Sequence, residues 1–80
     1  MLLSKAAWLP ATSVRGALRR AAGLTQADVA TTLGVGRVQV ARWETGTNEP
    51  RGDRRRAYSG LLRILAEQHP DAVAPTTGGP

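Results

Sequence analysis

The hydrophobic residues of this chain recur at the spacing of α-helices, and no stretch alternates as a β-strand would. Four amphipathic segments lie between residues 12 and 69, each bounded by residues that cap or end a helix. Residues 1–11 form an apolar arm before them, and residues 70–80, rich in proline, glycine and threonine, are expected to be a disordered tail. The pattern therefore predicts one all-α domain at 12–69.

Capping residues set the bounds of the first two predicted helices. The first begins at Thr12 or Ser13, either of which can cap it, and ends before Gly23, which can take a left-handed conformation. Thr25 is the predicted N-cap of the second helix, and Asp28 completes a capping box. The apolar positions expected to face the core are Val14, Leu18 and Ala21 in the first helix, and Val29, Ala30 and Leu33 in the second.

The third and fourth predicted helices supply the rest of the core. Gly34 is expected to end the second helix with a positive φ, and the third helix then covers residues 37–45. The fourth covers about 53–68, because Pro70 cannot continue a helix. The apolar positions expected to face inward are Val40 and Trp43 in the third helix, and Tyr58, Leu61, Leu62 and Leu65 in the fourth.

The charge of the chain points to a polyanionic partner. Eleven basic residues oppose six acidic ones, which gives a net charge of +5, and all but one of the basic residues are arginines. A basic domain attracts phosphate groups over long distances, and the planar guanidinium suits bidentate contacts to phosphate and guanine. A soluble protein from an arginine-rich proteome would have the same composition.

Several classes of function are not expected. The chain has no cysteine and one histidine, so we expect neither a disulfide nor a metal site, and no cofactor. No arrangement of nucleophile and base is visible, so we expect no enzyme. The opening MLLSKAAWLP is too short to span a bilayer and is interrupted by Lys5, which predicts neither a signal peptide nor membrane association.

The stretch 24–46, LTQADVATTLGVGRVQVARWETG, resembles the helix-turn-helix of the phage Cro/repressor family, also called the XRE or lambda-repressor-like family. The resemblance covers roughly residues 13–66 and implies a compact four- to five-helix domain whose third helix enters the major groove of DNA. The family often has two helices after the third, whereas this sequence predicts one long helix. Seven residues stand at the offsets of the family's template: Gln26, Ala30, Gly34, Val40, Trp43, Glu44 and Gly46.

The resemblance implies that the third helix reads bases through Arg37, Val38, Gln39 and Arg42. Arginine can donate two hydrogen bonds to guanine, glutamine can pair with adenine, and valine can contact the methyl group of thymine. A solvated helix face would have the same composition, so the residues themselves leave both interpretations open.

Phosphate contacts are expected on both sides of the third helix. Gln26 resembles the family residue that binds a phosphate and braces the recognition helix. The run RGDRRR places arginines at the start of the fourth helix, where the helix dipole disfavours positive charge, so a phosphate partner would explain them. Arg19 and Glu44 match a family pair that joins the first helix to the third. The phosphate candidates are Thr25, Gln26, Asn48, Arg51, Arg54 and Arg55.

We therefore expect a sequence-specific, double-stranded DNA-binding transcriptional regulator. It would be a small repressor or Cro-like switch of a phage or bacterium, cytoplasmic and associated with the nucleoid when bound, and a homodimer on a pseudo-palindromic site. One alternative is an antitoxin-type interaction protein that binds a partner through its N-terminal arm and autoregulates its promoter. Another is a phage DNA architectural or recombination accessory protein. The apolar arm residues that could pack on the core or on a second copy are Leu2, Leu3, Trp8 and Leu9.

Overall fold

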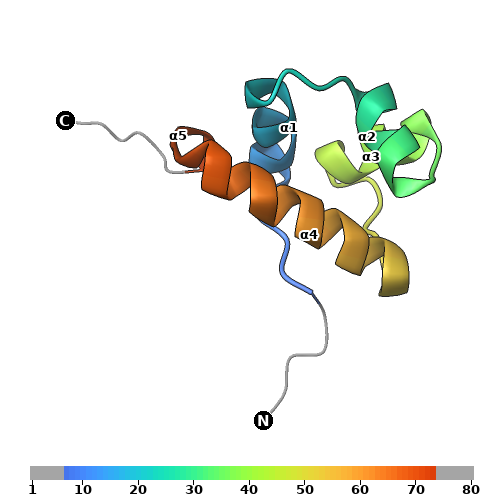
Figure 1. Ribbon diagram of the computed structural model, residues 1–80. Coiled ribbons are helices and arrows are strands. Elements are labelled where there is room, and N and C mark those ends of the chain that lie inside the picture. The colour runs from blue at the N-terminus through green and yellow to red at the C-terminus, as the bar shows by residue number, and fades with distance from the viewer. Residues whose placement is uncertain (1–6, 74–80) are drawn as a thin grey trace, which may run out of the picture.

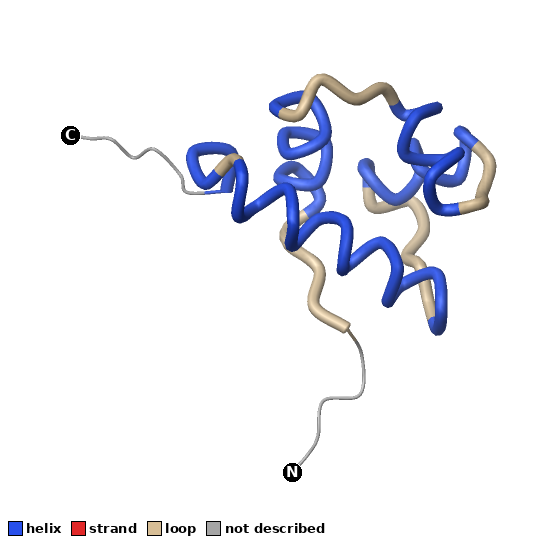
Figure 2. The backbone as a smooth tube through the Cα atoms, in the orientation of Figure 1, coloured by secondary structure: helices blue, strands red, loops and turns tan. Residues whose placement is uncertain are grey.

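The computed structural model describes residues 7–73, and within this range the chain forms five helices and no strand. Helix α4 crosses the molecule, with α1 and the α2–α3 pair on one side of it and α5 folded back at its C-terminal end (Figure 1). Short loops join the helices (Figure 2). The predicted all-α fold is confirmed. The helices are α1 (Thr12–Ala21), α2 (Gln26–Leu33), α3 (Arg37–Thr45), α4 (Gly52–Gln68) and α5 (Pro70–Val73).

The core is built from all four longer helices. Trp43 of α3 and Tyr58 of α4 are fully buried, with ring centroids 4.8 Å apart and planes tilted by 38°. Such aromatic pairs add about 0.5–1.5 kcal/mol beyond the burial of their area. The inward positions predicted for α3 are confirmed, and those of α4 hold except that Leu61 is only half-buried. The buried apolar residues are Leu18, Val29, Ala30, Val40, Trp43, Tyr58, Leu62 and Leu65.

The start and inner face of α1 differ from the prediction. Neither Thr12 nor Ser13 caps the helix: Ala11 occupies the N-cap, with no side-chain capping hydrogen bond in the described part of the chain. The Arg15 side chain fixes this entry, because its Nε donates to the Pro10 carbonyl at 2.9 Å. Ala21 is exposed rather than inward, and the buried face of α1 includes Arg15 instead. Hydrophobic patterning picks out apolar residues only, so it passed over an arginine on the inner face.

The second helix begins and ends as its sequence predicts. The Asp28 N–H donates to the Thr25 hydroxyl at 3.0 Å, and the Thr25 N–H donates to the Asp28 carboxylate at 2.9 Å. These backbone and side-chain hydrogen bonds from Thr25 hold the pKa of Asp28 below its ordinary value. At the other end, Gly34 has φ +72°. Val35 then packs against the core, and its N–H donates to the Ala30 carbonyl at 2.9 Å.

The chain remains helical beyond the point where a tail was predicted. Pro70 ends the helical run of α4 but begins α5, a position that proline tolerates because the first N–H groups of a helix have no partner within it. Ala72 and Val73 pack against the core, and α5 contacts both α1 and α4. Two helices therefore follow α3, not one. The rest of the predicted tail, 74–80, lies outside the described residues, as do Leu2 and Leu3 of the arm.

No helix within residues 7–73 combines the length and the apolar character needed to cross a membrane.

Candidate nucleic-acid interface

One face of helix α3 packs in the core, and the opposite face is exposed to solvent. Val40 and Trp43 are fully buried on the inner side. Arg37 and Arg42 are exposed on the outer side, and the Val38 side chain is 52% exposed. Gln39 is half-buried. The four residues predicted to read bases thus occupy the solvent side of the helix, while the tight turn at Gly34 separates it from α2.

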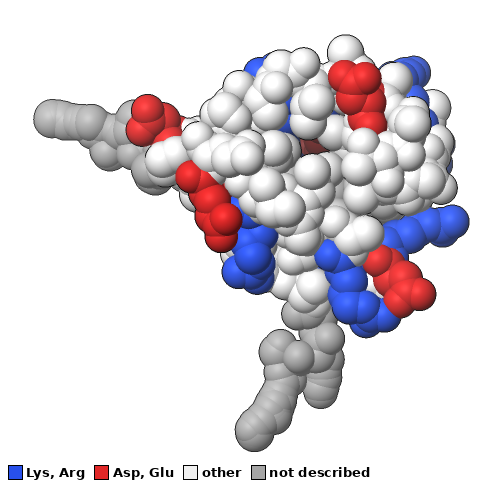
Figure 3. Space-filling view, viewed as in Figure 1, with Lys and Arg blue, Asp and Glu red and all other residues white. Residues whose placement is uncertain are grey.

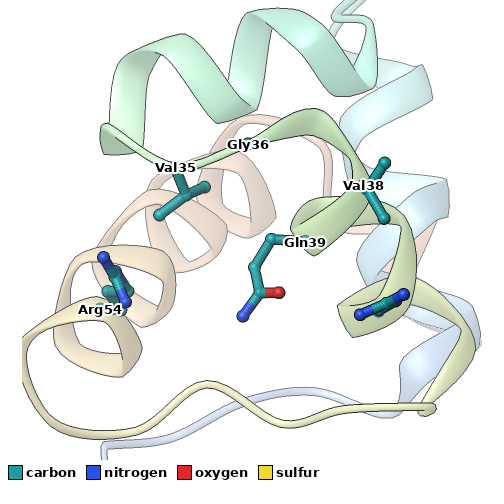
Figure 4. Close-up of a pocket in the computed structure, with 6 residues that line it drawn as sticks. Val35, Gly36, Val38, Gln39 and Arg54 are labelled. Atoms are coloured by element: carbon teal, nitrogen blue, oxygen red, sulfur yellow. The ribbon is translucent and has the colours of Figure 1, made fainter.

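An open groove of about 420 Å³ lies beside α3. Val35 and Gly36 of the α2–α3 turn line one part of it, and Arg54, from the first turn of α4, lines another. In Figure 4, the Gln39 side chain extends into the space between Val38 and Arg54. The groove brings three of the four base-reading candidates together with one phosphate candidate. Its lining residues are Val35, Gly36, Val38, Gln39, Arg42 and Arg54.

A chain of polar contacts runs from the start of α3 to its end. Arg37 Nη1 donates to Gln26 Oε1 at 3.2 Å, and Gln26 Nε2 donates to Glu44 Oε1 at 3.1 Å. Glu44 also accepts from Arg19, whose Nε and Nη2 lie 2.6 and 3.1 Å from its two carboxylate oxygens. Arg19 Nη1 completes the chain by donating to the Leu24 carbonyl at 2.9 Å. These contacts tie α3 to α1 and α2, and they confirm that Arg19 and Glu44 form a pair.

The carboxylate of Glu44 is charged for a specific reason. Burial alone would raise its pKa, but hydrogen bonds from Arg19 and Gln26, together with the positive charges of Arg19 and Arg20, outweigh burial and lower it. In turn, the hydrogen bond to Glu44 raises the pKa of Arg19. Both partners therefore stay ionised, and Gln26 is held between two charged groups. Gln26 thus contacts both ends of α3, while its predicted phosphate contact stays a prediction.

The phosphate candidates occupy different environments. Asn48, Arg51 and Arg54 are exposed, on the loop before α4 and on its first turn. Thr25 is exposed, but its hydroxyl and its N–H both serve the capping box. Arg55 is half-buried, and its Nε donates to the Ala7 carbonyl at 2.7 Å. This contact holds the Arg55 side chain against residue 7 of the arm, and the phosphate contact predicted for Arg55 stays a prediction.

Basic side chains gather over the start of α4, with acidic side chains among them (Figure 3). Arg56 forms an ion pair with Asp53 within the same helical turn. Arg55 Nη1 lies 3.9 Å from Glu49. Within residues 7–73, by contrast, no ion pair or side-chain hydrogen bond engages the guanidinium of Arg54. The three consecutive arginines therefore differ in how freely each can meet an external anion.

One important residue was missed by the sequence reasoning. The Arg15 side chain is almost fully buried, and its Nη1 donates to the Trp43 carbonyl at 3.0 Å and to the Glu49 carboxylate at 3.2 Å. It therefore fixes the end of α3 and the loop that follows it. Its place three residues before Leu18, on the inner face of α1, was the available signal.

Among residues 7–73, no cluster of histidine and carboxylate side chains could hold a metal ion.

Comparison with protein families gave one match. The sequence model of the Helix-turn-helix family HTH_3 matches residues 16–64, which is more than half of the chain. The matched segment runs from α1 into α4 and includes the whole of α2, α3 and the groove. Comparison with curated proteins gave no match, and neither did comparison with solved structures.

Proposed function

Because the chain belongs to the XRE, or lambda-repressor/Cro-like, helix-turn-helix family and is a DNA-binding regulator, we propose that it is a sequence-specific transcriptional repressor. It reads the major groove of double-stranded DNA with the outer face of α3, through Arg37, Val38, Gln39 and Arg42. This proposal is supported by the packing of α3: Val40 and Trp43 are buried on its inner face, and the basic outer face lies in solvent.

The backbone of the duplex is bound from the two sides of α3. Gln26 lies at the start of α2, while Asn48, Arg51 and Arg54 lie on the loop and first turn that follow α3. Contacts of this kind fix the register of a protein on DNA without reading its sequence. One recognition helix covers one half-site, so the protein acts as a homodimer on a pseudo-palindrome, in the cytoplasm of a bacterium or of a phage-infected cell.

Selection of bound sites from random duplexes tests this function. We expect an enriched inverted repeat whose half-sites are separated by about one helical turn, with affinity that falls steeply as salt rises. Arg42→Ala should relax the preference at one base position by about 1–3 kcal/mol. Arg63→Ala, which removes the same charge from an exposed site in the second half of α4, is the control and should keep the preference. Binding without any enriched sequence would contradict the repressor and favour an architectural protein that coats DNA.

A second function is favoured by the surface around the arm. The Trp8 side chain is 39% exposed with Arg63 Cζ 5.0 Å from its ring centre, and Ile64 of α4 is 53% exposed. Contiguous apolar patches mark protein contacts, and this second function requires that Trp8 and Ile64 belong to one such patch. An antitoxin that binds its partner through the arm would use them. A stoichiometric protein complex that is lost on deleting residues 1–11, while DNA binding persists, would support this second function.

A further inference from the structure

The groove beside α3 combines an apolar wall with a cation. Val35 and Val38 supply the apolar side chains, and Val35 is fixed in place because it packs against the core. Gln39 reaches into the space beside Val38, and Arg54 stands at the α4 side of the groove (Figure 4). A site for a methyl group alone needs only apolar side chains, and a site for a phosphate alone needs only polar or charged ones. This groove presents both kinds within one volume of about 420 Å³.

Two arginines line the groove: Arg42 on the outer face of α3, and Arg54 on the first turn of α4. Of the three consecutive arginines at the start of α4, only Arg54 has no partner in the described part of the chain. Arg55 is engaged by the Ala7 carbonyl, and Arg56 by Asp53. Arg54 is exposed and, within residues 7–73, has neither an ion pair nor a side-chain hydrogen bond. It lies in the first turn of α4, where the helix dipole adds to the local positive potential. The Arg54 guanidinium is therefore available to an anion that enters the groove beside the two valines.

Thymidine carries this combination of groups in duplex DNA. The C5-methyl group of its base projects into the major groove, where it is the apolar feature of the base edge. This methyl group also lies on the side of the base that faces the backbone of its own strand. The phosphate on its 5′ side is therefore the nearest charge. We propose that the groove binds one thymidine nucleotide of the half-site, with the methyl group against Val35 and Val38 and the 5′ phosphate on Arg54. This inference rests on the proposed function, since it names what one part of that interface recognises.

Deoxyuridine tests the apolar half of the site. In the selected operator, each thymine of one half-site is replaced in turn by uracil, which keeps every hydrogen-bonding group and lacks only the methyl group. At one position the affinity of the unaltered protein should fall about fourfold, as expected for one buried methyl group. Val38→Ala should reduce this difference between thymine and uracil to the part that Val35 contributes. Val38 is more than half exposed, so the variant is expected to fold.

A neutral methylphosphonate tests the charged half. Placed 5′ of the same thymine, it should weaken binding of the unaltered protein but have no further effect on Arg54→Gln. Arg54→Gln should reduce the steepness of the slope of log affinity against log salt by about 1, the value for one phosphate contact. The reduction should be equal for the thymine and uracil operators. Arg56→Gln removes the same charge from the same helical turn, outside the groove, and should preserve the methylphosphonate effect.

The outcomes separate this inference from the proposed function. If sites are selected but no uracil substitution changes affinity, or if the selected half-site contains no thymine, the thymidine site is wrong and the repressor stands. A uracil effect of undiminished size in Val38→Ala would also overturn it, as would a methylphosphonate effect that persists in Arg54→Gln. If no sequence is selected at all, the proposed sequence-specific repressor is wrong, and the thymidine site, which rests on it, is wrong as well.

Discussion

At the scale of single residues, two buried polar groups carry more information than the apolar core around them. Glu44 is surrounded by donors, and its charge is stabilised by Arg19 and Gln26. The Tyr58 hydroxyl is buried without a hydrogen-bond partner among residues 7–73. A satisfied buried carboxylate positions its neighbours, whereas an unsatisfied buried hydroxyl costs about 1–3 kcal/mol. The two sites should therefore respond oppositely to conservative substitution.

Glu44→Gln should destabilise the fold by about 2 kcal/mol, because it leaves Arg19 partly buried without its counter-charge. Because the pKa of Glu44 is lowered in the folded state, its contribution to stability is present above its ordinary value of 4.5 and is lost as the pH falls below it. Urea denaturation between pH 3 and pH 7 should accordingly show a shallower acid dependence in the variant. Glu67→Gln, at an exposed position of α4, serves as the control, and equal effects of the two substitutions would contradict the role of the pair.

Tyr58→Phe should leave the free energy of unfolding unchanged or raise it by up to about 1 kcal/mol at neutral pH. Burial, followed by the negative charge of Glu44, raises the pKa of Tyr58 to about 12 from its ordinary value of 10.0. The folded state thus holds this proton more tightly than the unfolded state, so the stability linked to the proton is complete below pH 10.0 and is lost as the pH rises through about 12. Alkaline denaturation followed by circular dichroism should lose this step in the variant. A marked loss of stability at neutral pH would show that the hydroxyl has a partner.

At the scale of helices, glycine conformation separates turns from helix interiors. Gly34 ends α2 with φ +72°, and no described atom lies within 4 Å of a Cβ built on it. Gly60 lies inside α4, is exposed, and also has open space around such a Cβ. The two positions therefore offer the same room to a methyl group but differ in backbone conformation.

Gly34→Ala should cost about 1–2 kcal/mol, because an L-residue is strained in the left-handed conformation. Gly60→Ala should instead stabilise by about 0.5–1 kcal/mol, since alanine loses less conformational entropy in a helix. Thermal unfolding of the two variants beside the parent protein measures both signs. Equal shifts in Tm would mean that the α2–α3 turn relaxes away from its positive φ.

The helices were predictable from sequence where local chemistry sets them. The Thr25 capping box and Gly34 bound α2 through their own side chains and backbone, so the sequence was sufficient there. The start of α1 was mispredicted because the buried Arg15 side chain bonds the Pro10 carbonyl there, and Arg15 is held inward by its contacts with Trp43 and Glu49, which lie far along the chain. Helix α5 was missed because its four residues are helical through packing on α1 and α4, and such a short segment has no periodicity to detect. The groove was equally hidden, because Val35 and Arg54 meet only in the folded chain.

At the scale of the whole molecule, Arg15 joins parts of the chain that are far apart in sequence. Its guanidinium contacts the Pro10 carbonyl of the arm, the Trp43 carbonyl at the end of α3, and Glu49 in the following loop. Arg55 shares Glu49 and donates to the Ala7 carbonyl, so a second arginine fastens the same arm. Residues 7–11 of the arm and the loop bearing the phosphate candidates are thereby parts of one tertiary unit.

Arg15→Ala should destabilise the protein by at least about 2 kcal/mol, because two buried carbonyl groups, those of Pro10 and Trp43, lose their donor at once. Arg20→Ala removes the same charge from an exposed position of the same helix and should change stability by less than about 0.5 kcal/mol. Urea denaturation gives both values. A small effect of Arg15→Ala would show that the arm and loop are held by other contacts.

The hydrogen bond between Arg37 and Gln26 has a consequence for the encounter with a duplex. Freely rotating side chains lose about 0.5–1.5 kcal/mol of entropy each when they are immobilised at an interface. Arg37 is restrained by Gln26, which Glu44 holds in turn, before any partner arrives. In the proposed complex, docking would exchange one acceptor of Arg37 for another, so Arg37 would lose less entropy than a freely rotating side chain. Gln26→Ala should therefore slow the productive step after collision while leaving the diffusive approach, which depends on overall charge, unaltered.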